Sequence, residues 1–183
     1  MRRLLFLLVF ASASLLQAAE LVDRIVAIVG TEVITLSDLQ AAPRSGKKDP
    51  LNGLIREKIL KIETERTGIE VTSDDLARGI AEVLRRNRIS IDQLKEEMAR
   101  QGKTFEQYKE ELRREIRRMK FMGQVIVPRI RVSEEEIQKG LGKNPTEEDR
   151  LLARQKIVES RLSQELDNYL DEARAKTYVE IKK

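Results

Sequence analysis

Carboxylates are the side chains that could support acid–base chemistry in this 183-residue chain, because it contains no histidine and no cysteine. The lack of both residue types excludes histidine-based triads, thiolate nucleophiles, disulfides and metal sites built on imidazole or thiolate. Two acidic groups remain as candidates for an acid–base pair or a divalent-cation site: Asp74 with Asp75, and Glu134 with Glu135 and Glu136. Each group falls in the first turn of an expected helix, where carboxylates cap backbone amides and interact favourably with the helix dipole. We therefore expect no catalytic site, no cofactor and no metal.

Two arginine clusters, at residues 85–88 and 113–118, would suit phosphate or nucleic-acid binding. Glutamates alternate with the arginines of the second cluster. This spacing is typical of a solvated helix face on which charges three or four residues apart form ion pairs. We interpret both clusters as solvated surface rather than as a ligand site.

The N-terminus has the pattern of a secretory signal peptide at residues 1–19. Arg2 and Arg3 form a basic start, residues 4–10 are apolar, and small residues follow up to Ala19. This order is typical of a cleaved leader. Cleavage after Ala19 would place Gln17 at the −3 position, which is an imperfect match, so an uncleaved membrane anchor is the alternative. The apolar run is, however, shorter than the roughly 20 residues that span a bilayer. Loss of Arg2 and Arg3 leaves 33 basic and 31 acidic residues, so the remaining chain is not expected to bind nucleic acid or to insert stably in a membrane.

The region around which the chain is organised starts at residue 25. Residues 25–29 and 33–35 are β-prone runs separated by a glycine-containing turn, which predicts a hairpin, and Ser37 is the expected N-cap of a helix directly after it. A two-stranded hairpin is only marginally stable alone. Residues 178–181 are a further strand candidate, so we expect the two ends of the chain to meet in a small β element.

The residues between these strands predict helices, because capping residues and stops recur along the sequence. A charged fraction of 36% and a hydrophobic fraction of 40% suit a folded, helix-rich protein. The expected helices are 37–42, 50–67, a helix opened by Thr72, one from Ser90 to Gly102, 105–126 ended by Pro128, one opened by Ser133, and 147–176. The apolar stripe expected on the last helix is Leu151, Val158, Leu162, Leu166, Tyr169, Leu170 and Ala173. The fold class is therefore mainly α, with a small β element that joins the termini.

A set of methionine and aromatic residues is the strongest candidate for a binding surface. These side chains gather on and beside the long helix at 105–126: Met98, Phe105, Tyr108, Met119, Phe121 and Met122. Such residues suit an adaptable surface for varied apolar partners, and ordinary core packing is the alternative for most of them. Phe121 lies off the main apolar stripe, next to Lys120, so we expect it to be exposed or in a groove.

The order of these segments resembles the SurA-type periplasmic chaperones. VITLSDL at residues 33–39 is similar to the start of the mature proteins of that family, and so are DQLKEEMARQGKTFEQYKEELRREI at 92–116 and RVSEEEI at 131–137. The last helix and strand, at about 146–183, resemble the C-terminal segment that completes the family's N-terminal core. The resemblance implies one SurA N-terminal-like domain over residues 20–183.

One departure from the family pattern limits what the resemblance implies. In the family, parvulin-type prolyl isomerase domains normally follow the segment that matches residues 133–137. Here residues 138–146 separate this segment from the last helix, and no residue matches a parvulin active site. We therefore expect no isomerase activity and no other enzyme activity.

The resemblance then implies an ATP-independent chaperone of the periplasm that holds unfolded outer-membrane or secreted polypeptides. Client segments would bind in a groove between the helical body and the long helices. A non-enzymatic scaffold or subunit of a cell-envelope complex with one fixed partner is the alternative. The chain would also allow a homodimer formed by helix swapping, with the polar loop at residues 43–48 as its hinge.

Overall fold

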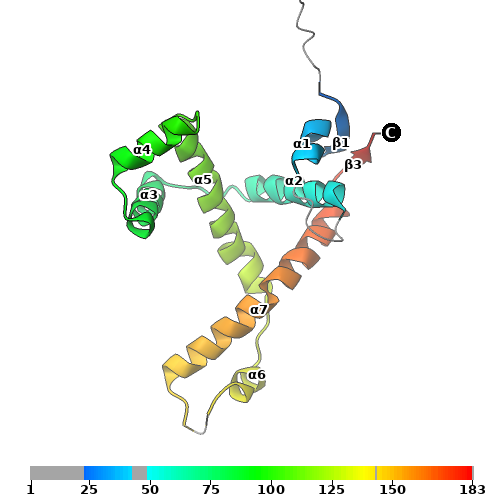
Figure 1. The fold of residues 1–183 in the computed structure, drawn as a ribbon. Helices are drawn as coiled ribbons and strands as arrows, with labels where there is room; N and C mark the ends of the chain where they lie inside the picture. The colour runs from blue at the N-terminus through cyan, green and yellow to red at the C-terminus, as the bar shows by residue number, and fades with distance from the viewer. Residues whose placement is uncertain (1–22, 43–48, 143, 183) are drawn as a thin grey trace, which may run out of the picture.

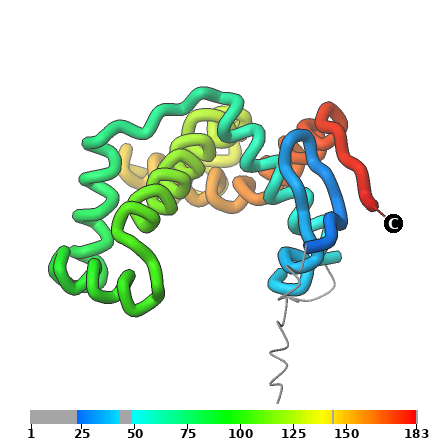
Figure 2. The backbone as a smooth tube through the Cα atoms, turned by 90° about the horizontal axis from the view of Figure 1, so that it is seen from above, coloured from blue at the N-terminus to red at the C-terminus, as the bar shows by residue number. Residues whose placement is uncertain are grey.

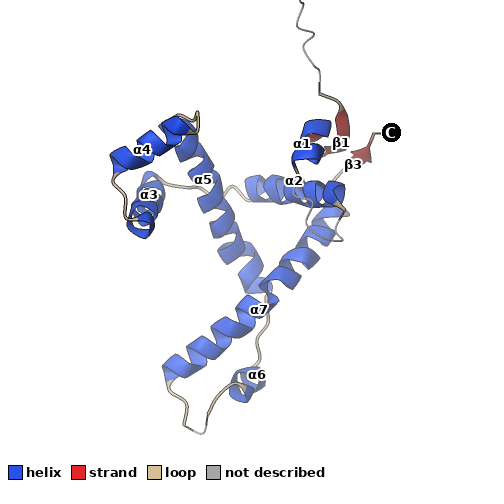
Figure 3. Cartoon of the chain, in the orientation of Figure 1, coloured by secondary structure: helices blue, strands red, loops and turns tan. Residues whose placement is uncertain are grey.

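The computed structural model describes residues 23–42, 49–142 and 144–182. The expected signal peptide at 1–19 and the expected hinge at 43–48 lie outside these residues. The described part is mainly α-helical and contains a three-stranded antiparallel sheet with the order β2-β1-β3 (Figure 3). The predicted fold class is confirmed.

The sheet joins the two ends of the described chain. β1 (Ile25–Val29) pairs with β2 (Glu32–Thr35) on one side and with β3 (Val179–Ile181) on the other. Gly30 has a φ of 55° at the first position of the hairpin turn, a conformation that glycine adopts without strain. Its amide also donates to the carbonyl oxygen of Tyr178 at 2.8 Å. The predicted hairpin and the predicted return of the chain end are both confirmed.

The first helix, α1 (Leu36–Ala41), is capped by a different residue from the one expected. Thr35, not Ser37, is the N-cap: its side chain accepts from the amide of Asp38, and the Asp38 carboxylate accepts from the Thr35 amide. Ser37 lies inside the helix, where its amide donates to Asp23 Oδ1 at 3.2 Å. The prediction was wrong by two residues because the Thr35–Asp38 pair forms a reciprocal capping box, which a lone serine cannot match.

The other helices begin where their capping residues predict. Asp49 caps the second helix, and capping boxes open each of the other five. Their bounds are α2 (Pro50–Arg66), α3 (Ser73–Asn87), α4 (Ile91–Arg100), α5 (Phe105–Phe121), α6 (Glu134–Lys139) and α7 (Glu147–Arg174). At 28 residues, α7 is about 42 Å long at 1.5 Å per residue.

The end of α5 differs from the expected continuous helix. The α-helical part stops at Phe121, a π-helical turn covers Met122–Ile126, and a 3-10 turn covers Val127–Arg129. A π turn closes between residues five apart, which allows Phe121 and Ile126 to be buried together in the core. An unbroken α-helix would turn these two side chains to different faces.

Hydrophobic packing divides the described chain into three parts (Figures 1 and 2). The sheet body consists of the sheet, α1, α2 and the C-terminal half of α7, and its core also takes in Phe121 and Ile126. The helical lobe consists of α3, α4 and α5, with Leu94 and Ile116 among its buried residues. The third part, the α6–α7 arm, is α6 with the N-terminal half of α7. Figure 1 shows that α5 descends from the lobe to meet α7 near the middle of that helix.

The expected apolar stripe of α7 is buried only at its C-terminal end. Leu170 and Ala173 are buried, and Leu162, Leu166 and Tyr169 pack against the core. Leu151 is 62% exposed, so its expected burial is wrong. The reason is geometric: the first turns of this long helix extend beyond the sheet body and pack against the short helix α6.

A buried polar contact joins α2 to α7 in the core. The hydroxyl of Tyr169 donates to Glu63 Oε2 at 2.7 Å, and Glu63 is only 3% exposed. Arg66 donates to the same oxygen at 2.7 Å, and the ring of Phe121 meets the edge of the Tyr169 ring at a centroid distance of 5.6 Å. Burial and the nearby carboxylate raise the pKa of Tyr169. The contact thus brings α2, α7 and the end of α5 together.

Tyr169→Phe should lower the free energy of unfolding by about 1–3 kcal/mol, because it leaves a buried carboxylate without one of its hydrogen-bond donors. Urea denaturation followed by circular dichroism measures this difference. Tyr178→Phe is the matched control, since that hydroxyl donates to an exposed carboxylate, Glu180, at 2.8 Å. Equal losses in the two variants would contradict the role given to Tyr169.

Candidate functional site

The six predicted binding residues do not form one surface. Phe121 is 0% exposed and lies in the core, so the expectation that it is exposed or in a groove is wrong. Met122 packs against the same core, and Met98 is buried in the helical lobe. Phe105 and Tyr108 are half-buried and stacked, with ring centroids 6.1 Å apart. Among the six, Met119 is the side chain that is mainly exposed, at 56%.

Phe105 is also covered by two cations. Lys95 Nζ lies 5.8 Å and Lys109 Nζ lies 5.6 Å from the centre of its ring. Cations at this distance are attracted to the face of an aromatic ring. The Phe105 ring is therefore engaged within the lobe rather than open to a ligand.

The exposed large apolar side chains form two groups. Three of them lie on the long helices, Met119 on α5 and Leu151 and Leu152 in the first turns of α7, and we call these three residues the α5–α7 apolar set. The second group lies on the small sheet and just before β3: Ile25, Val33, Tyr178 and Ile181. The sequence reasoning missed Leu152, which is 49% exposed. Adjacent residues in a helix point about 100° apart, so Leu151 and Leu152 cannot both lie on one narrow apolar stripe. The pair in the sequence therefore indicated that one of the two leucines would be outside it.

Charged side chains form most of the lining of the groove between the body and the long helices, although apolar contacts were expected there. A cleft of about 460 Å³ lies between α2 and α5, and we call it the α2–α5 cleft. Its floor includes Leu60 and Thr64, and charged residues of both helices form its walls. Glu65 and Arg117 line both this cleft and a second hollow along residues 68–71.

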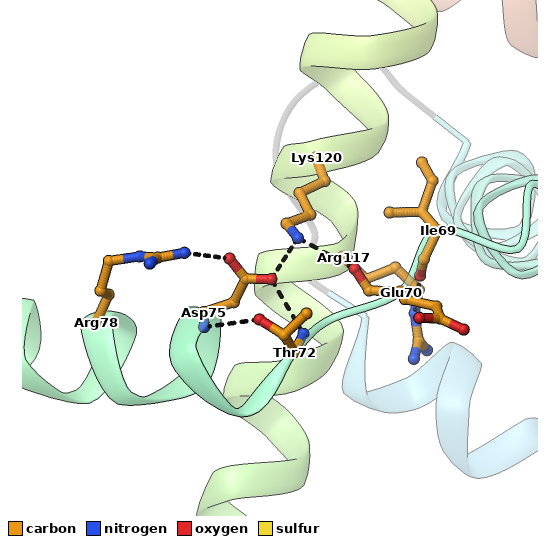
Figure 4. Close-up of polar contacts among 7 residues, drawn as sticks. All are labelled: Ile69, Glu70, Thr72, Asp75, Arg78, Arg117 and Lys120. Atoms are coloured by element: carbon orange, nitrogen blue, oxygen red, sulfur yellow. Dashed lines mark hydrogen bonds and ion pairs between the residues drawn. The ribbon is translucent and has the colours of Figure 1, made fainter.

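Two side chains of α5 hold the segment that connects the sheet body to the lobe (Figure 4). Arg117 Nε donates to the carbonyl oxygen of Ile69 at 3.1 Å, and Lys120 Nζ donates to that of Glu70 at 3.1 Å. Lys120 also donates to the carboxylate of Asp75 in the first turn of α3. These contacts fix the connection between α2 and α3, residues 67–72, against the last turns of α5.

Asp75 has a structural role rather than a catalytic one. Its carboxylate accepts from the amide of Thr72 at 3.0 Å, from Arg78 at 2.6 Å and from Lys120. These donors, Lys120 first, hold the pKa of Asp75 well below its usual range. Asp75 is therefore ionised at neutral pH and has no proton to give, which is unsuitable for a general acid.

Lys120→Met should loosen the connection between α2 and α3, because it removes the cation that bridges Glu70 and Asp75. We expect faster hydrogen exchange at the amide of Thr72, which donates to Asp75, and in the first turn of α3, measured by mass spectrometry, with little change in overall unfolding since the pair is near the surface. Lys109→Met is the control: its ion pair, with Glu106, lies within α5. Unchanged exchange in Lys120→Met would mean that the connection is held by packing alone.

Glu136 holds the α6–α7 arm in the same manner. Its carboxylate closes the capping box with Ser133 and also accepts from Arg161 of α7. Arg161 donates in addition to the carbonyl oxygen of Arg131 at 2.6 Å. The Arg161 guanidinium and the Ser133 amide lower the pKa of Glu136 from 4.5 to about 2. Like Asp75, this member of an acidic group is an ionised structural residue.

The Glu136–Arg161 pair makes the stability of the arm depend on pH. Because the pKa is lower in the folded state, the pair stabilises the fold above about pH 4.5 and this contribution is lost as the pH falls towards 2. Glu136→Gln keeps a side chain that can complete the capping box but removes the charge. Its melting temperature should therefore fall less steeply than that of the wild type between pH 4.5 and 2, whereas Glu135→Gln should follow the wild type. Parallel curves for the wild type and Glu136→Gln would contradict this assignment.

The described residues have neither a metal site nor a helix that could span a membrane. Within residues 23–42, 49–142 and 144–182, no cluster of three or more acidic residues has the arrangement of a metal site. In the same ranges, none of the helices combines the length and the apolar character that crossing a bilayer requires.

A known family model matches the part of the chain that contains α2 and the helical lobe. The family model described as the SurA N-terminal domain matches residues 45–121, a range that contains α2 to α5. The chain is 29% identical over 157 residues to the Chaperone SurA of Pseudomonas putida, which covers 74% of this chain and 37% of that protein. It is 30% identical over 138 residues to the Chaperone SurA of Pseudomonas syringae pv. tomato, over 66% of this chain and 32% of that protein.

A solved structure shares the fold. A chain from the structural study of PEB4 and Cj1289, two SurA-like chaperones of Campylobacter jejuni, matches with a TM-score of 0.63 and 15% identity, over 88% of this chain and all of that one. Together the matches confirm the resemblance to the SurA-type chaperones. The chain spans about a third of the length of the curated relatives it matches.

Proposed function

We propose that this chain is an ATP-independent periplasmic chaperone that holds unfolded outer-membrane or secreted polypeptides and assists their folding or assembly. The observation that carries the proposal is the α5–α7 apolar set, which leaves Met119, Leu151 and Leu152 largely open to solvent. Leu151 and Leu152 are adjacent in the sequence, and exposed apolar side chains that lie together are typical of interaction surfaces. The similarity to proteins named Chaperone SurA supports the same class of function.

The chemistry of these side chains suits weak binding of many clients. Methionine and leucine adapt their shape to different apolar partners. Burial of one such side chain contributes about 1.5–3 kcal/mol, and much of that gain is offset by the cost of association and of ordering the client. A surface of this kind holds a client briefly and releases it without an energy source.

The same proposal includes the location and the lack of enzyme activity. The leader-like residues 1–19 support export to the periplasm. The lack of histidine and cysteine, with Asp75 and Glu136 both engaged in structural contacts, supports a non-enzymatic role without isomerase activity. Of the predicted binding residues, Met119 remains our candidate for direct client contact, and the half-buried Tyr108 is a second candidate.

Chaperone activity is tested with the chain from Glu20 onwards and an unfolded outer-membrane β-barrel protein diluted from urea. We expect light scattering to be suppressed at near-equal molar ratios, and a parallel proline-isomerisation assay on a peptide to give no signal. Replacing Met119, Leu151 and Leu152 with serine should raise the concentration needed for suppression several-fold, because the client loses its apolar contacts. Ile25→Thr, Val33→Thr and Ile181→Thr together form the matched control on the other apolar group.

Two outcomes would contradict this assignment. If the sheet variant loses activity and the α5–α7 variant keeps it, the client surface is on the sheet. If aggregation is unchanged at several-fold excess of the wild type, the alternative function becomes the better one: a non-enzymatic scaffold or subunit of a cell-envelope complex with one fixed partner.

The proposed homodimer by helix swapping is a separate question. Sedimentation in the same buffer would show whether two copies of the chain associate.

A further inference from the structure

The α2–α5 cleft has an unusual concentration of charge on its two walls. The wall from α2 carries Glu57, Lys61 and Glu65, and the wall from α5 carries Glu111, Arg114, Glu115, Arg117 and Arg118. Acidic and basic groups are equal in number, so the cleft has no net charge that would favour a simple anion or cation. A ligand that matches it must carry both signs.

Several of these charges have no partner within the described residues. Lys61 pairs with Glu32, Glu111 pairs with Lys103, and Arg117 donates to a backbone carbonyl. The remaining five have no ion pair or side-chain hydrogen bond in the ranges that the structure describes: Glu57, Glu65, Arg114, Glu115 and Arg118. Elsewhere on α5, Lys109 and Arg113 are paired with glutamates of the same helix. The side of α5 that faces the cleft is therefore the side whose charges stay available.

The floor of the cleft holds a buried hydroxyl without a partner. Thr64 lines the cleft, is 5% exposed, and its Oγ1 has no hydrogen-bond partner. A buried polar group that makes no hydrogen bond is unfavourable, but this oxygen is enclosed and is not among the contacts that the cleft offers a ligand. Leu60 lies beside it and supplies an apolar contact.

The adjoining hollow presents backbone groups. It is lined by Gly68, Ile69, Glu70 and Val71 and shares Glu65 and Arg117 with the cleft. The carbonyl oxygens of Ile69 and Glu70 accept from α5, but the amides of residues 69–71 have no acceptor within the part of the chain that the structure describes (Figure 4). Main-chain donors along an extended segment can bind the main chain of a second polypeptide.

We propose that the α2–α5 cleft and the hollow beside it bind an extended polypeptide segment that carries side chains of both charges. The main chain of this segment meets residues 69–71, and its charged side chains pair with the free charges on the two walls. This inference rests on the proposed function and adds a polar contact to it. Strands of outer-membrane barrels alternate apolar and polar residues, so an extended client of this class carries polar side chains that the charges of the cleft can bind.

Two fluorescein-labelled ten-residue peptides test the proposal by anisotropy with the chain from Glu20 onwards. Both peptides have the same apolar residues at alternate positions. The intervening positions are Lys and Glu in the charged peptide and Ser and Gln in the neutral one. We expect the charged peptide to bind about tenfold more tightly, the effect of a few exposed ion pairs together. This advantage should shrink as sodium chloride is raised from about 0.05 to 0.5 M.

Two variants assign the advantage to the cleft. The double variant Arg114→Glu with Arg118→Glu should bind the charged peptide no more tightly than the neutral one. Its affinity for the neutral peptide should be unchanged. The control variant Arg154→Glu with Lys176→Glu changes the net charge by the same amount on exposed residues away from the cleft. It should still bind the charged peptide more tightly than the neutral one.

The outcomes separate this proposal from the proposed function. Equal affinity of the wild type for the two peptides, with aggregation still suppressed, overturns the cleft and leaves the chaperone. An advantage that survives Arg114→Glu with Arg118→Glu also overturns the cleft. If neither peptide binds and aggregation is unchanged, both proposals fail.

Discussion

The contact between Tyr169 and Glu63 is the interaction on which the arrangement of the described chain depends. It joins α2 to the C-terminal half of α7 inside the core, and the ring of Phe121 packs against Tyr169 at the same point. The sheet body, the end of α5 and the return of α7 towards β1 therefore meet at one place. The helical lobe and the α6–α7 arm extend outward from it with little core of their own, which leaves Met119, Leu151 and Leu152 open to solvent.

Capping carboxylates have a second role in this protein. Asp75 and Glu136 each close a capping box at the start of a helix, and each also binds a cation from another helix, Lys120 or Arg161. One side chain thus fixes both where a helix begins and how that helix is held against its neighbour. Because both contacts favour the ionised form, these two carboxylates are suited to structure and not to proton transfer.

Local signals predicted most of the fold, and contacts between distant residues decided what the sequence left open. The capping boxes, the glycine turn and the terminal strand depend on residues a few positions apart, so they were visible in the sequence. The π turn after Phe121 was not, because it follows from the core that Phe121 and Ile126 share with α2 and α7. The binding residues were only partly predicted because the exposure of a side chain also depends on distant contacts. At Leu151, for example, the helix extends beyond the elements that pack against it.

The central position of β1 has a consequence for the order of folding. Its two neighbours are β2, a few residues away, and β3, at residues 179–181. The helical lobe depends on contacts within residues 73–121 and can form early during synthesis, since local contacts form fast. The sheet body must wait until residues 179–181 have been made. Until then α2 keeps an apolar face uncovered, so the nascent chain itself passes through a state that needs protection from aggregation.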